Sequence, residues 1–236
     1  MNTLLIEPDN ITNDCVTVFG RQYLHLVNVH RVKPGDTIRV GAVNGHLGSG
    51  LITDIHKDRI TLSLHLCEPP PKPLPLTLFL ALPRPKMLRR ILQTVAAMGV
   101  KNLHIINAHR VEKSFWQTSL LNPEVIANEL RLGLEQAGDT VIPTVFFHRL
   151  FKPFLEDTIH AYTQDHAAYV AHPKADERCP VGVEGPCALA IGPEGGFIPY
   201  EVEKFQRVGF ASVHLGPRIL RVENAVPALV SRLYPS

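Results

Sequence analysis

The stretch CALAIGPEGGF, residues Cys187–Phe197, joins an apolar run to a loop that contains three glycines. The run 187–191 is typical of a buried strand, and the loop follows at its carboxyl end. Glycines let a ligand approach the backbone closely, and ligands of open α/β sheets bind at the carboxyl ends of strands. A tight turn would explain one of these glycines readily but not all three. The stretch therefore predicts a ligand-binding loop on a parallel sheet.

A second stretch, HLGPRILRVENA (His214–Ala225), repeats this order of apolar strand, glycine turn and loop before a helix. We expect Asn224 to cap that helix, so that Pro227 lies in its first turn. A structural ion pair is the simplest interpretation of Arg221 and Glu223, but two glycine loops at adjacent strand ends favour a shared pocket. Neither a G-x-G-x-x-G nor a G-x-x-x-x-G-K-[ST] motif occurs, so ordinary dinucleotide and phosphate loops are not supported.

Strand and helix patterns alternate throughout the second part of the chain. The expected strands are 76–82, 103–107, 168–171, 187–191 and 211–215, and the expected helices are 86–98, 122–138, 199–208 and 225–233. This alternation predicts a mostly parallel sheet with helices on both faces, which is an α/β fold.

A different pattern precedes residues 68–75, EPPPKPLP, which we expect to form a stiff connector. The segments 36–43 and 47–55 flank Asn44-Gly45, a strong hairpin signal. Residues 60–66 alternate between apolar and polar side chains, as in a strand with one buried face. We therefore expect a small β-barrel or curled sheet over 1–67, and the α/β domain over 76–236.

Composition excludes several classes of protein. The net charge is +2, hydrophobic residues make up 45% and charged residues 19%, which indicates a folded globular chain. There is neither a signal-like start nor an apolar run near the ~18 residues of a membrane span, so we expect a cytoplasmic protein. The four cysteines form no C-x-x-C pair, so we expect neither a disulfide framework nor a metal site.

Positive charge is concentrated in residues 84–113, which hold seven Lys and Arg residues and one acid, Glu112. Three of these cations, Lys86, Arg89 and Arg90, lie on the polar side of the expected helix 86–98. An ordinary solvated helix face would explain those three alone. Arg110 extends the patch beyond the helix, which favours binding of nucleic acid.

The runs IGPEGGF and LGPRILRVENA resemble the motifs of the RsmE-type family of the SPOUT superfamily, bacterial methyltransferases that act on a uracil of small-subunit (16S) ribosomal RNA. Residues 25–36, HLVNVHRVKPGD, are similar to a segment of that family's RNA-binding barrel. The resemblance implies a PUA-like barrel followed by an α/β domain with a deep trefoil knot. It also implies S-adenosylmethionine as methyl donor, methylation at uracil N3, and a homodimer. The apolar stripe of the expected helix 225–233 would suit a dimer contact, although packing within its own domain is the usual fate of such a stripe.

The resemblance also implies roles for individual residues. Arg221 and Glu223 match an R-x-E pair beside the reactive methyl group, where Arg221 would stabilise charge on a uracil oxygen and Glu223 would hold Arg221. The residues expected to bind the cofactor are Ala171, His172, Pro173, Ile191, Gly192, Pro193, Glu194, Gly195, Gly196, Leu215, Gly216, Ile219, Leu220 and Arg221. Those expected to bind RNA are His25, Arg31, Lys86, Arg89, Arg90 and Arg110.

The chain departs from the family pattern at several positions on the RNA side. Thr94 and Ala97 stand where relatives carry lysine and glutamate, and Asp139 stands in place of an arginine. Two other interpretations therefore stay open beside methylation of uridine N3. The chain could methylate a different RNA nucleotide, or it could be a non-catalytic RNA-binding relative.

Overall fold

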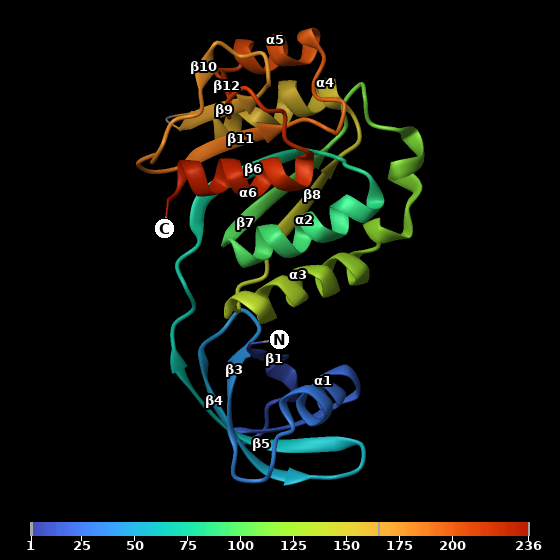
Figure 1. Ribbon diagram of the computed structural model, residues 1–236, viewed down its shortest axis with the longest axis vertical. Coiled ribbons are helices and arrows are strands. Elements are labelled where there is room, and N and C mark those ends of the chain that lie inside the picture. The colour runs from blue at the N-terminus through green and yellow to red at the C-terminus, as the bar shows by residue number, and fades with distance from the viewer. Residues whose placement is uncertain (1, 165, 236) are drawn as a thin grey trace. The chain divides into compact units, whose positions relative to one another are not determined.

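The structure, a computed structural model, describes residues 2–164 and 166–235 and divides into two compact units. Unit 1 comprises Met1–Lys72 and Arg131–Ile142, and unit 2 comprises Pro73–Leu130 and Pro143–Ser236 (Figure 1). The segment 131–142 therefore belongs to unit 1, although the sequence analysis assigned it to the second domain. Nothing in its local pattern distinguishes it from the rest of a helix, because its partners lie far away in the sequence.

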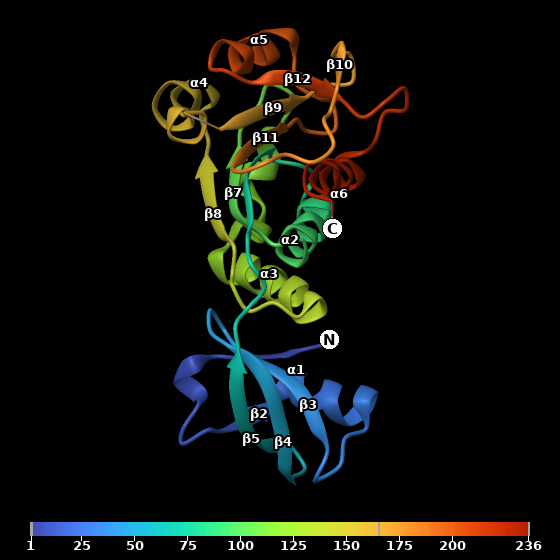
Figure 2. The ribbon, with the colours of Figure 1, turned by 90° about the vertical axis from the view of Figure 1, so that its left-hand side faces the viewer.

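Unit 1 is built on a curled five-stranded sheet with the strand order β1-β3-β4-β5-β2 (Figure 2). The strands are β1 (Leu4–Ile6), β2 (Cys15–Phe19), β3 (Thr37–Ala42), β4 (Leu47–Ile55) and β5 (Arg59–Glu68), and α1 (Gly20–His25) follows β2. Alternating residues of β5, Ile60 and Leu62, are fully buried in the core of this unit. The predicted hairpin joins β3 and β4, and Asn44 adopts the left-handed backbone that its turn requires.

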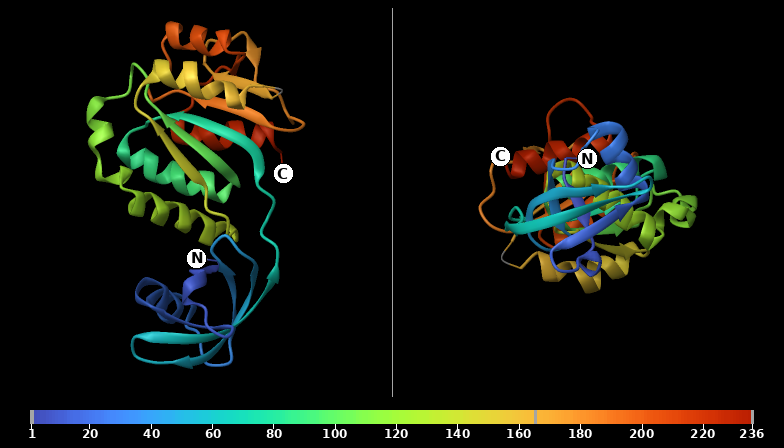
Figure 3. Two further views of the ribbon diagram at one scale, coloured as in Figure 1. Left: turned by 180° about the vertical axis from the view of Figure 1, so that it is seen from behind. Right: turned by 90° about the horizontal axis from the view of Figure 1, so that it is seen from below.

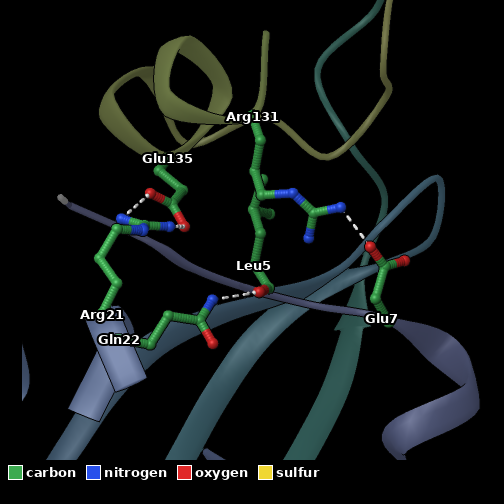
Figure 4. Close-up of polar contacts among 6 residues, drawn as sticks. All are labelled: Leu5, Glu7, Arg21, Gln22, Arg131 and Glu135. Carbon is green, nitrogen blue, oxygen red and sulfur yellow. Dashed lines mark hydrogen bonds and ion pairs between the residues drawn. The ribbon is translucent and has the colours of Figure 1, made fainter. Parts of the chain in front are cut away.

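Ion pairs and hydrogen bonds hold residues 131–142 within unit 1 (Figure 4). The guanidinium of Arg21 donates two hydrogen bonds, of 2.9 and 2.7 Å, to the carboxylate of Glu135, whose side chain is 1% exposed. Arg131 forms an ion pair with Glu7. Asp139 is buried and accepts a hydrogen bond from the amide of Val141 at 3.0 Å. The acid that replaces the family's arginine is thus part of a turn in this structure.

Replacing Arg21 with alanine is expected to lower the free energy of unfolding by about 1–3 kcal/mol, because the buried Glu135 carboxylate loses both donors. Arg39 makes the same two-bond pair with Glu68, but both side chains are about half exposed. Arg39→Ala is the matched control and should change stability little. Urea unfolding of the two variants tests this; equal losses would mean that burial of Glu135 contributes nothing.

Unit 2 contains a seven-stranded sheet in which every neighbouring pair is parallel, as the alternation of elements predicted. The strand order is β10-β12-β9-β11-β6-β7-β8. The strands are β6 (Leu74–Ala81), β7 (Val100–Ile106), β8 (Thr144–His148), β9 (Ala167–Ala171), β10 (Glu177–Arg178), β11 (Cys187–Ile191) and β12 (Ala211–His214). All five residues of β11 are buried, which agrees with its apolar sequence. The half-exposed edge strand β8 was not predicted.

Helices cover both faces of this sheet (Figures 2 and 3). The helices after β6 are α2 (Pro85–Ala97), α3 (Pro123–Ala137), α4 (Phe151–Pro153), α5 (Pro199–Arg207) and α6 (Val222–Leu233), with further helical turns over 113–121 and 154–162. The residues of α3 from Arg131 on belong to unit 1. Asn122 caps α3 as predicted, since its side-chain oxygen accepts the amide of Glu124 at 2.9 Å. None of the helices in the described residues is both long and apolar enough to cross a membrane.

Two expectations about α6 are wrong. The helix begins at Val222 with Arg221 as its N-cap, because the Arg221 carbonyl accepts the amides of Asn224 and Ala225. Asn224 is therefore not the cap, and Pro227 lies inside the helix.

The apolar stripe of α6 is covered within one chain: Val226, Leu229, Val230 and Leu233 are at most 1% exposed. It therefore supplies no argument for a dimer, and the homodimer and the knot stay predictions from the resemblance.

Candidate functional site

Three loops of unit 2 surround one cavity of about 460 Å³. They follow β9, β11 and β12, which are adjacent in the sheet, so their carboxyl ends meet at the same edge. Except for Arg221, every residue expected to bind a cofactor lines this cavity. The lining residues that were not predicted are Lys174, Phe197, Val213, His214, Pro217, Arg218, Val222, Ala225 and Leu229.

The loop after β11 is folded so tightly that it needs glycine. A Cβ on Gly192 would lie 2.8 Å from the backbone nitrogen of Phe197, and Gly196 has a φ of +70°. The amide of Gly196 donates to the carbonyl of Pro193 at 2.7 Å, which closes the turn. These glycines leave the backbone open toward the cavity.

Neighbouring loops hold the outer side of this turn. The Glu194 carboxylate accepts the backbone amide of Arg84 at 2.9 Å, at the end of the loop after β6. The guanidinium of Arg110, which follows β7, donates to the carbonyl of Gly195 and lines the cavity. Arg110 was predicted to bind RNA, and the structure places it at the rim of the predicted cofactor site.

Glu201 ties the loop after β7 to the start of α5. Its side chain is 2% exposed, and its two oxygens accept the backbone amides of His109 at 2.6 Å and Ile198 at 3.0 Å. Glu201 was not among the predicted site residues. A signal was available, because a glutamate at the third position of a helix that starts with proline is typical of a capping contact to the residue before the helix.

The cavity holds a buried polar atom that has no partner within the described chain, Nδ1 of His172. Burial lowers the pKa of His172 below its ordinary value, and the nearby charges of Lys174 and Arg110 lower it further. The imidazole is therefore neutral near pH 7. A buried ring nitrogen without a partner costs free energy, which a ligand with a complementary group would recover.

These features define what the cavity can bind. Its walls include apolar side chains such as Ile191, Phe197 and Leu229, and its loops present backbone groups and one unpaired imidazole nitrogen. The site therefore suits a small organic ligand with both a flat apolar part and hydrogen-bonding edges. Within residues 2–164 and 166–235, no cluster of three or more His, Cys, Asp or Glu side chains is arranged to hold a metal.

Arg221 and Glu223 lie at the start of α6 and do not line the cavity. Arg221 is exposed, and no hydrogen bond or ion pair joins it to Glu223 in the described structure. The contact in which Glu223 holds Arg221 is thus not formed here. Glu223 instead lies in the first turn of α6, where a negative charge is favourable.

The predicted RNA-binding residues differ in how free their charges are. Arg89 pairs with Glu129 at 3.0 Å, and Glu129 is nearly buried and also accepts from Gln93 at 2.6 Å. Arg89 therefore has a structural partner, whereas Lys86 and Arg90 are exposed on α2. Their neighbour Thr94 bonds the Arg90 carbonyl at 3.0 Å, as an ordinary helix residue does.

The predicted RNA-binding residues of unit 1 are His25 and Arg31. Arg31 is exposed and His25 is half-buried, and the ring of His25 contacts that of His30, with 3.1 Å between their Nε2 atoms. Arg31 has a φ of 52° and ends the helical segment that follows α1.

Comparisons with known sequences agree with this architecture. A family model described as an RNA methyltransferase domain matches residues 70–234, and one described as an RNA methyltransferase PUA domain matches residues 20–64. Ribosomal RNA small subunit methyltransferase E of Treponema pallidum is 29% identical, over 97% of this chain and 88% of that protein. Ribosomal RNA small subunit methyltransferase E 2 of Borreliella burgdorferi is 27% identical, over 86% of this chain and 84% of that protein.

Solved structures share the fold. Ribosomal RNA small subunit methyltransferase E from Neisseria gonorrhoeae, bound to S-adenosyl methionine, superposes with a TM-score of 0.76 at 23% identity, over 98% of this chain and 95% of that one. A Legionella pneumophila protein in complex with the same cofactor gives 0.75 at 21% identity, over 98% and 94%. The RNA methyltransferase model spans well over half of the sequence. The chain therefore belongs to the RNA methyltransferase family.

Proposed function

We propose that the protein transfers the methyl group of S-adenosylmethionine to N3 of a uridine in small-subunit ribosomal RNA. The observation that supports this most strongly is the single cavity formed by three loops at adjacent carboxyl ends of the parallel sheet. The names of the relatives from Treponema pallidum and Borreliella burgdorferi support the RNA substrate. The S-adenosyl methionine in the Neisseria gonorrhoeae structure supports the methyl donor.

The cavity fits this cofactor by its chemistry. Gly192 and Gly196 would leave room for the adenosine beside the backbone, and Ile191 and Leu229 would contact its flat face. The unpaired Nδ1 of His172 would form a hydrogen bond with a polar group of the cofactor. When bound, S-adenosylmethionine supplies an electrophilic methyl group on a sulfonium.

The chain's contribution to the reaction is orientation and electrostatic stabilisation. Holding two reactants in line can remove up to about 7–11 kcal/mol of a barrier, even without covalent help from the protein. Arg221 would stabilise the negative charge that develops on a uracil oxygen as N3 loses its proton. The exposed guanidinium of Arg221 has no carboxylate partner in the described structure, so it is free to contact the substrate. Glu223 would position Arg221 once RNA is bound.

RNA would be held by exposed cations. In unit 2 these are Lys86, Arg90 and Arg110, and in unit 1 the candidate is Arg31. Burial lowers the pKa of His25 below its ordinary value, so His25 would contact RNA through hydrogen bonds of its ring and not as a cation. The match of residues 20–64 to an RNA methyltransferase PUA domain supports a role for unit 1 in RNA binding. The cytoplasmic location stays a prediction.

Gly196→Val is expected to abolish binding of S-adenosylmethionine, because its side chain would project into the cavity. Gly182→Val is the matched control: Gly182 lies outside the cavity, has a φ of +72° against +70°, and like Gly196 has open space where a Cβ would lie. Both variants carry the same backbone strain, so calorimetric titration with the cofactor separates strain from blockage. Equal affinities in the two variants would place the cofactor elsewhere.

The function is tested by incubating the protein with S-adenosylmethionine and small-subunit ribosomal RNA, followed by mass spectrometry of the nucleosides. The wild type should produce N3-methyluridine. Arg221→Ala should lower single-turnover methylation about tenfold for every 1.4 kcal/mol of stabilisation lost, with cofactor affinity unchanged. Arg221→Lys should recover little, because a point charge cannot replace two planar donors.

Each other outcome of this experiment selects an alternative. A different methylated nucleoside would move the target to another RNA position. No methylated nucleoside, with RNA still bound, would identify a non-catalytic relative. Wild-type rates in both variants would remove Arg221 from the chemistry.

A further inference from the structure

A second hollow in unit 2 lies between α5 and the segment that follows β8, with a volume of about 230 Å³. We call it the Tyr200 groove, and its residues are Phe151, Lys152, Leu155, Glu156, His160, Tyr200, Lys204, Arg207 and Val208. Leu155 is buried, and the ring of Phe151 packs edge-on against Phe205 at 5.6 Å between centroids. The groove therefore has an apolar floor and a charged rim with three Lys and Arg side chains and one acid, Glu156.

Tyr200 is the most unusual residue of this groove. It lies in α5, whose packed residues Glu201, Val202 and Phe205 are buried, yet 51% of its own surface is exposed. The ammonium of Lys204 lies over its ring, 5.4 Å from the centroid. An exposed aromatic ring beside a cation is the combination on which nucleic acid bases stack in single-stranded RNA.

The charges around the groove leave one cation available. Lys152 lies 3.7 Å from the Glu156 carboxylate, and Arg207 pairs with Glu203. Lys204 has no carboxylate partner within the described chain, so its contact with the Tyr200 ring leaves its charge uncompensated. A phosphate group would neutralise it.

The groove lies on the same edge of the sheet as the cofactor cavity. Phe151 follows the carboxyl end of β8, and Tyr200 follows the glycine loop of β11; these parallel strands end at the same edge of the sheet, with β6 and β7 between them (Figure 1). Glu201, the residue after Tyr200, bonds the amide next to Arg110, and Arg110 bonds Gly195 in the cavity wall. The first turn of α5 thus connects the two sites rigidly.

We propose that the Tyr200 groove binds a second nucleotide of the RNA substrate, with its base stacked on Tyr200 and its phosphate paired with Lys204. The groove would hold a nucleotide near the one that is methylated, which would fix the register of the RNA strand at the cavity. This inference rests on the proposed function for the identity of the RNA, but the groove's affinity for RNA can be measured without methyl transfer.

The test is the affinity of the full chain for a labelled single-stranded oligouridylate of about ten nucleotides, which spans a site of this kind. Fluorescence anisotropy without cofactor should show about tenfold weaker binding for Tyr200→Ala. Tyr200→Phe keeps the ring and should bind within about twofold of the wild type. Lys204→Gln should reduce the slope of log affinity against log salt by about 0.7.

Lys72→Gln is the control for loss of charge, because Lys72 is exposed and lies in the connector between β5 and β6, outside unit 2. It should change neither affinity nor salt slope, and cofactor titration should give wild-type affinity for every variant. Wild-type RNA affinity in Tyr200→Ala, or equal losses in Tyr200→Ala and Tyr200→Phe, would overturn the proposal. So would a wild-type chain that does not bind the oligouridylate, which would assign the groove to another class of partner.

These results can be told apart from failure of the proposed function. A protein that methylates no RNA but loses oligouridylate affinity only in Tyr200→Ala would refute the proposed function and support the groove. A protein that forms N3-methyluridine while Tyr200→Ala binds RNA normally would support the proposed function and refute the groove.

Discussion

The buried carboxylate of Glu201 is the contact on which the arrangement of the site depends. A carboxylate at 2% exposure is costly unless its oxygens accept hydrogen bonds, and here the amides of His109 and Ile198 supply them. One amide belongs to the loop after β7 and the other to the start of α5. The two segments are therefore held together at the edge where the cavity opens.

Other contacts follow from this one. With the β7 loop fixed, Arg110 reaches the carbonyl of Gly195 and supports the glycine turn from outside. The Glu194 carboxylate adds a bond to the amide of Arg84, so the loops after β6, β7 and β11 form a connected wall. The turn itself can stay open toward the ligand because its glycines carry no side chains.

The features that could be predicted from the sequence are those that a local pattern of residues determines. The loops at 191–196 and 215–220 combine apolar strands with glycines, and the structure brings them together at one cavity because adjacent parallel strands end at one edge. The parallel sheet and α2 could also be predicted from the sequence, because their apolar residues follow a strong periodic pattern. The PUA-like fold of unit 1 was predicted only from the resemblance to the RsmE-type family.

The remaining features depend on contacts between distant residues, which periodicity does not encode. Glu201 and His109 are far apart in the chain, as are Arg21 and Glu135, so neither the cavity wall nor the placement of residues 131–142 could be predicted. Arg89 was predicted to bind RNA from the local excess of positive charge and from the resemblance. Its partner Glu129 lies on another helix, so the sequence did not reveal the pair. The stripe of α6 was ambiguous for the same reason, since only the fold shows that it is covered within one chain.

The most direct test of this account is calorimetric titration of S-adenosylmethionine into Glu201→Gln, with Glu203→Gln on the same helix as control. The amide keeps the shape of the side chain but places an NH₂ group against one of the two backbone donors. We predict about a tenfold or greater loss of cofactor affinity for Glu201→Gln, because an unpaired buried amide costs on the order of 1–3 kcal/mol. Glu203, which is exposed and pairs with Arg207, should give wild-type affinity. Wild-type affinity in Glu201→Gln would contradict the claim that this carboxylate builds the site.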